Sequence, residues 1–200
     1  MTAEPETVPV PLARFTGIRL VHTALRRDLV SLPERIRGLG PGDLVAAAEA
    51  AARWRVLARI LMAHQEYEDC RLWPLLRGRR PELRLLMRWL EADHLVIERE
   101  LVSGAAMIAG LVGDTRRAPA VADVVEGFVA TIDAHLRVEE EQVLPELARA
   151  VAPGEFVGTL GASLGAIDET EPFAGEPRLA GRAPVHAMAW LLDGMGDGRR

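Results

Sequence analysis

The sequence predicts an all-α protein: an antiparallel, up-down-up-down four-helix bundle over residues 12–151, followed by a loop-rich C-terminal extension over 152–200. Apolar residues make up 49% of the chain and aromatic residues only 4%, so the core is mostly aliphatic, which favours helices over strands. Glycines and prolines also divide residues 12–151 into four long stretches whose apolar residues recur every three to four positions. Short loops between amphipathic helices favour a bundle.

Each stretch has a clear beginning or end. The first is broken by the glycine-rich run from Arg37 to Gly42, and Asp43 is the expected N-cap of the second. Pro81 suits the first turn of the third. The extension is expected to pack on the bundle or to act as an interaction segment. The four predicted helices cover about residues 12–36, 44–76, 82–112 and 119–151.

Composition excludes several classes of function. The net charge is −5 and no basic patch is interleaved with aromatics, which argues against nucleic-acid binding. All 24 basic residues are arginines, which excludes Schiff-base lysine chemistry and a phosphate-loop lysine. No apolar run is long enough for a membrane span. The lone cysteine, Cys70, cannot form an internal disulfide, so we expect a reducing, cytoplasmic location.

Four of the five histidines belong to an internal repeat. His22 and His94 are 72 residues apart, and His64 and His135 are 71 residues apart. Pro74 and Pro145 each follow the second histidine of a half by ten residues, and each is expected to kink or end its helix. A site that needs imidazole from four helices explains this repeat.

Glutamates follow three of these histidines by four residues, a spacing that places both side chains on one face of a helix. Burying several carboxylates among apolar residues is costly unless cations neutralise them. Nitrogen and oxygen ligands without thiolate suit iron or manganese, with zinc as an alternative. Seven ligands are too many for one ion and predict a dinuclear site with an open position. The predicted ligands are His22, His64, Glu68, His94, Glu98, His135 and Glu139.

A ferritin-like di-iron site would need a Glu-x-x-His motif on each of two helices. Glu91 and His94 fit this spacing, but Leu61 and Ile132 stand where the other glutamates would be. The ferritin-like alternative is therefore rejected.

The two proline-containing halves together resemble the hemerythrin-like, His–His–Glu cation-binding family over residues 12–151. The most specific strings are His64-x3-Glu68-Asp69 running into Leu72-Trp73-Pro74-x-Leu76, and His135-x3-Glu139-Glu140 running into Val143-Leu144-Pro145-x-Leu147. The resemblance implies a four-helix bundle that holds two iron ions in a non-haem centre and binds dioxygen or a related small ligand. It also implies one terminal histidine ligand from each helix, with Glu68 and Glu139 bridging the metals.

Glu98 departs from the family pattern, because it stands where oxygen-carrying hemerythrins place a further histidine. An anionic ligand there would stabilise oxidised metals, which favours reaction with dioxygen or peroxide, or sensing, over reversible transport. Its partner in the repeat is Arg26.

Three acidic residues beside the ligands, Asp69, Asp93 and Glu140, are candidates for orienting the imidazoles. Being next in sequence to a ligand, each points about 100° around its helix. The fifth histidine, His186, lies outside the repeat and is expected to be structural or exposed.

Three functions remain open. The first is a di-iron protein that binds dioxygen or reacts with hydrogen peroxide, including enzymatic peroxide decomposition. The second is an iron or oxygen sensor that signals through a partner protein without turnover. The third is a metal-free interaction bundle. We expect a monomer or weak homodimer with no nucleic-acid or membrane partner.

Overall fold

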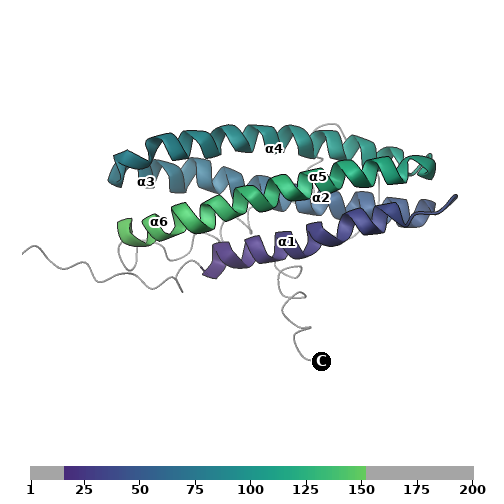
Figure 1. Cartoon of the computed structure of the whole chain (residues 1–200), viewed down its shortest axis with the longest axis horizontal. Coiled ribbons are helices and arrows are strands. Elements are labelled where there is room, and N and C mark those ends of the chain that lie inside the picture. The colour runs from purple at the N-terminus through teal and green to yellow at the C-terminus, as the bar shows by residue number, and fades with distance from the viewer. Residues whose placement is uncertain (1–15, 152–200) are drawn as a thin grey trace, which may run out of the picture.

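The computed structural model describes residues 16–151, and every regular element in that range is helical (Figure 1). The predicted all-α class is confirmed for this part of the chain. The extension over 152–200, with His186, lies outside it. The long helices are α1 (Thr16–Arg37), α2 (Leu44–Tyr67), α4 (Arg84–Gly110) and α5 (Ala118–Val138). The short elements are η2 (Glu68–Leu72), α3 (Trp73–Arg79), η3 (Pro81–Leu83), η4 (Thr115–Arg117), η5 (Glu139–Val143) and α6 (Leu144–Ala150).

The four long helices enclose one core, since α1 and α4 each contact both α2 and α5. Buried apolar side chains form two clusters along the bundle. The larger includes Ile36 and Leu111, and the smaller includes Ile18, Leu76 and Met87. The repeated histidines lie where the two clusters meet, so polar side chains interrupt an otherwise aliphatic core.

Pro74 and Pro145 do not end the helical path. Tyr67 and Val138 end regular α-helices, and a five-residue π-helical segment follows each. Pro74 and Pro145 then lie in the first turn of α3 and α6. Proline is tolerated there because its missing N–H would have no α-helical partner. The expected break is therefore a change of helix type just before each proline.

Trp54 ties α2 to α4. Its indole Nε1 donates a 3.0 Å hydrogen bond to the carbonyl of Leu101, and its ring lies 5.0 Å from that of Phe128. Gly104 makes this possible, because a Cβ at that position would overlap the Trp54 ring. This contact fixes the spacing of the two helices in the larger cluster.

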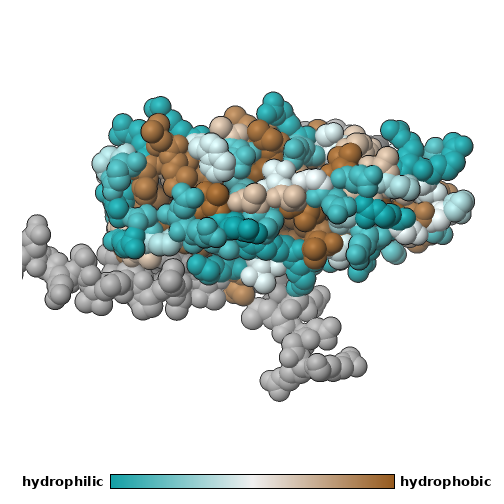
Figure 2. Space-filling view, in the orientation of Figure 1, coloured by the Kyte–Doolittle hydropathy of each residue, from teal (hydrophilic) through white to brown (hydrophobic). Residues whose placement is uncertain are grey.

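The visible surface alternates between hydrophilic residues and small apolar patches (Figure 2). None of the helices over residues 16–151 is both long enough and apolar enough to cross a membrane. Cys70 is exposed and free. The cytoplasmic location stays a prediction.

Candidate metal centre

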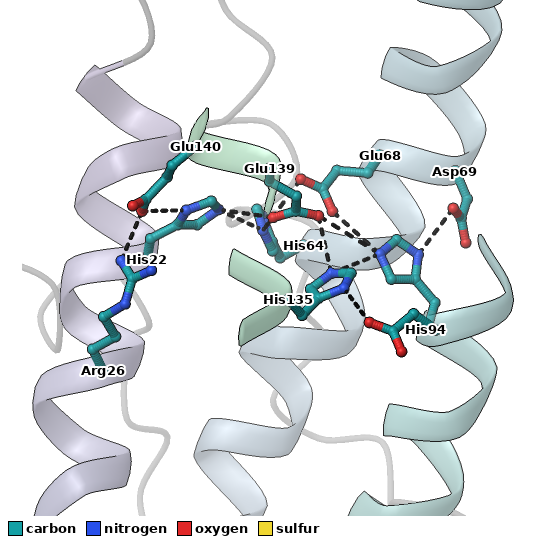
Figure 3. A network of polar contacts seen from close by, with 10 residues as sticks. His22, Arg26, His64, Glu68, Asp69, His94, His135, Glu139 and Glu140 are labelled. Carbon is teal, nitrogen blue, oxygen red and sulfur yellow. Dashed lines mark hydrogen bonds and ion pairs between the residues drawn. The ribbon is translucent and has the colours of Figure 1, made fainter. Parts of the chain in front are cut away.

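Six buried side chains from the four long helices and the two π-helical segments meet in the middle of the bundle (Figure 3). None is more than 4% exposed. They form two overlapping groups, and within each group the candidate ligand atoms lie within 4.8 Å of one another. We call the first group position A and the second position B. Position A consists of His22, His64, Glu68 and Glu139, and position B of His94, His135, Glu68 and Glu139.

Each glutamate is shared between the positions, one oxygen to each. Glu68 Oε1 lies 3.3 Å from His64 Nε2, and Glu68 Oε2 lies 3.6 Å from His94 Nε2. Glu139 Oε2 lies 3.4 Å from His22 Nε2, and Glu139 Oε1 lies 3.0 Å from His135 Nε2. Both carboxylates are thus placed to bridge two cations.

All four imidazoles direct Nε2 towards the glutamates. The Nε2 atoms of His22 and His64 are 3.0 Å apart in position A, and those of His94 and His135 are 3.1 Å apart in position B. Nitrogens this close suit a common cation, because both imidazoles of a pair can direct a lone pair to it. The inward nitrogen is therefore the candidate ligand atom of each imidazole.

Three outward-facing Nδ1 atoms bind carboxylates from a neighbouring segment (Figure 3). His22 Nδ1 lies 2.8 Å from Glu140 Oε1, His94 Nδ1 lies 3.0 Å from Asp69 Oδ1, and His135 Nδ1 lies 2.8 Å from Asp93 Oδ2. These contacts bear out the candidate orienting residues. An N–H donated to a carboxylate fixes the ring and leaves Nε2 free for a cation.

The π-helical segments keep the helical path aligned with the core beyond Glu68 and Glu139. In an α-helix, four residues advance about 40° beyond one full turn, so residues at i, i+4 and i+8 drift off one face. Each glutamate begins a π-helical segment closed by an i→i+5 bond, from Trp73 N–H to the Glu68 carbonyl and from Leu144 N–H to the Glu139 carbonyl. The wider turn cancels the drift. His64, Glu68 and Leu72 are accordingly all buried.

The structure does not bring Glu98 together with the other six predicted ligands. Helix α4 is α-helical throughout, with His94, Ile97 and Leu101 in the core. Glu98 is exposed and lines a surface hollow with Leu95, Arg99 and Val102, among others. A signal for the difference exists in the sequence: proline follows His64 and His135 by ten residues, whereas Gly104 holds that place after His94. Glu91, the ferritin-like alternative, pairs with Arg77.

A family model, the hemerythrin HHE cation binding domain, matches residues 15–147. The chain belongs to this family. Comparisons with curated proteins and with solved structures give no match. The match spans all four helices that hold the hemerythrin-like site, and the predicted resemblance is confirmed.

The protons of the hemerythrin-like centre are unevenly distributed. Burial raises the pKa of Glu68 well above its usual value, and the nearby Glu139 raises it further. Burial also disfavours charge on Glu139, but contacts with His135 and His94 outweigh it and lower the pKa. Without a cation, Glu68 therefore holds a proton more readily than Glu139 does.

The pKa values of the histidines in the centre also differ from one another. Burial and the neighbouring His22 lower the pKa of His64 to about 3. Burial lowers the pKa of His94 too, but Asp69 and Glu139 outweigh it and raise the value to about 9. Without a metal ion, His94 is therefore much more basic than His64.

The donor atoms fit a cation. Glu68 Oε2 and both oxygens of Glu139 are buried and accept no hydrogen bond from residues 16–151. Unsatisfied carboxylate oxygens are costly in a protein core, and a metal ion satisfies them directly. The buried histidines and glutamates are thus suited to hold metal ions, in agreement with the family's cation-binding role.

Proposed function

We propose that the protein holds two iron ions, one in position A and one in position B, and binds or reacts with dioxygen or hydrogen peroxide there. Manganese and zinc remain alternatives for the same nitrogen and oxygen donors. We also propose that the four helices run antiparallel in up-down-up-down order. The short connections over residues 38–43 and 111–117 support that order.

The observation that carries the proposal is the division of oxygens between the two positions. Each cation would receive two imidazole nitrogens and one oxygen from each glutamate. Four protein donors leave an octahedral ion with open positions for a small ligand. Bound iron would supply the redox chemistry and the binding position for that ligand.

The chain's own residues prepare the site. Asp69, Asp93 and Glu140 hold three imidazoles with Nε2 inwards. The apolar clusters on both sides limit the access of water, so charge within the site is weakly screened. A bound cation would favour the deprotonated form of Glu68, because it would stabilise the carboxylate.

The exposed position of Glu98 changes one expectation. An anionic ligand there was the reason to prefer reaction or sensing over reversible oxygen carriage, and that reason no longer holds. Carriage and reaction are therefore both consistent with the proposed centre, and turnover distinguishes them.

One observation favours the alternative of a sensing module without turnover. Within residues 16–151, the buried carboxylates and imidazoles are the six candidate ligands and Asp28, which pairs with Arg53 at 2.7 Å. No further buried carboxylic acid or imidazole in this range is left to donate a proton to a bound peroxide. Reversible ligand binding with no peroxide consumption would support the sensing module, with a partner protein receiving the signal.

The test is metal content per chain combined with absorbance before and after azide and peroxide. Two irons per chain with ligand-sensitive bands in the near-ultraviolet and visible would support the proposal. Absence of metal after purification, and again after anaerobic iron loading, would contradict it. The same sample then reports peroxide consumption, which separates an enzyme from a binding module.

A further inference from the structure

The outward nitrogen of His64 differs from those of the other three histidines. Among the residues that the structure describes, His64 Nδ1 is buried without a hydrogen-bond partner, whereas the Nδ1 atoms of the other three each contact a carboxylate. The internal repeat explains the difference. His135 contacts Asp93, the residue before His94, and the equivalent residue before His22 is Val21, a fully buried core residue. Val21 therefore stands at the position where a fourth carboxylate would contact His64 Nδ1.

Glu140, the carboxylate in contact with His22 Nδ1, also interacts with an arginine, which reduces its effect on the imidazole. Glu140 Oε1 contacts His22 Nδ1 at 2.8 Å and accepts a 2.7 Å hydrogen bond from Arg26 Nη1. Arg26 Nε donates a second bond, 2.8 Å long, to Asp133. The guanidinium neutralises Glu140, so this carboxylate raises the basicity of His22 less than a free one would.

The two carboxylates that support position B are not paired with an arginine in the described part of the chain. Within the described residues, the ion-pair partner of Asp69 is His94 and that of Asp93 is His135. Two uncompensated carboxylates therefore support position B. Position A has one carboxylate, and it is neutralised by an arginine.

We propose that the two positions are unequal in affinity: B binds its cation first and tightly, and A binds second and exchanges more readily. This inference rests on the proposed two-cation centre. A carboxylate on the outward nitrogen makes the imidazole a better ligand, and losing such a support typically weakens metal binding about 10–100-fold. Since two differences point the same way, we expect the affinities to differ by at least about tenfold. Arg26 is then a positioning residue that weakens position A through Glu140.

The test is a titration of the metal-free full-length protein with Co²⁺ under anaerobic conditions, followed by calorimetry and by the visible absorbance of the bound ion. We expect two steps of one ion per chain each, with the first tighter. Asp93→Asn weakens the first step about 10–100-fold, and Arg26→Gln tightens the second step. Circular dichroism of each variant checks that the bundle is intact.

Two surface variants match these changes in charge. Arg37→Gln and Asp123→Asn each break an exposed ion pair between α1 and α5, and neither residue contacts a ligand. Both should leave the two steps as in the wild type. Two binding steps of equal affinity in the wild type would overturn the inference that the positions are unequal. The same change in affinity in Arg26→Gln and Arg37→Gln would overturn it too. In either case, two bound ions per chain would still support the proposed function. Failure to bind Co²⁺ at all would overturn both.

Discussion

Glu68 and Glu139 occupy equivalent places in the two halves of the chain, and each begins a π-helical segment four residues after a histidine. Their side chains meet between the same two pairs of histidines, and each directs one oxygen to position A and the other to position B. The two changes of helix type thus begin at the two carboxylates that lie between positions A and B.

The first prediction separates metal binding from folding. Glu68→Gln should abolish binding at both positions but leave the metal-free protein close to wild-type stability, because Glu68 is held protonated by burial and by Glu139. A cation at 100 times its Kd stabilises the wild type by about 2.7 kcal/mol, and this gain should vanish in the variant. Denaturant unfolding with and without metal measures both effects.

Glu98→Gln is the matched control, since Glu98 is exposed on α4 and outside both positions. Its metal content and metal-dependent stabilisation should equal those of the wild type. Loss of metal in Glu98→Gln would show that Glu98 is a ligand after all.

The second prediction concerns pH. The pKa of His94 is raised from 6.5 to about 9 in the metal-free protein, and that of His135 is also raised. Protonated His94 therefore stabilises the metal-free fold below pH 6.5, and this contribution is lost as pH rises through 9. Over the same window metal affinity should rise, by about tenfold per pH unit for each proton displaced.

Calorimetry of metal binding in two buffers with different ionisation enthalpies counts the released protons. Affinity that stays constant from pH 6.5 to 9, with no proton release, would contradict the assigned protonation of His94. Protonation of His64 should contribute little, because its pKa of about 3 leaves it uncharged throughout this window.

The third prediction tests the contact between α2 and α4. Gly104→Ala places a methyl group against the Trp54 ring, so the free energy of unfolding should fall by about 1–3 kcal/mol. Gly127→Ala on α5 meets no atom within 4 Å and should raise it by about 0.5–1 kcal/mol, because alanine favours the helix. If both variants gain stability, the tight approach of Trp54 to α4 is wrong.

Much of the centre could be predicted from the sequence because repetition and burial act together. Imidazoles at His22, His64, His94 and His135 recur in register within apolar stripes, and all four are buried at one level of the bundle. The helical class followed from the aliphatic composition and from the glycine and proline breaks.

Glu98 shows where the pattern was insufficient. A four-residue spacing does not by itself place a side chain on the core face of an α-helix: Leu90 and His94 are both buried on α4, whereas Glu98 is exposed. The prolines after His64 and His135 mark the two places where a π-helical segment follows the helix, but a helical break was the simpler interpretation. The contacts of Asp69, Asp93 and Glu140 were also hard to place, because each supports a histidine on another helix.

The most direct test of two cations bridged by Glu68 and Glu139 is X-ray absorption at the iron edge of the loaded, full-length protein. A bridged pair predicts a shell of nitrogen and oxygen neighbours together with a second iron at roughly 3.5–4 Å. In Glu68→Gln this iron–iron scattering should disappear. A wild-type spectrum with nitrogen and oxygen neighbours only, at full iron loading, would contradict the shared centre.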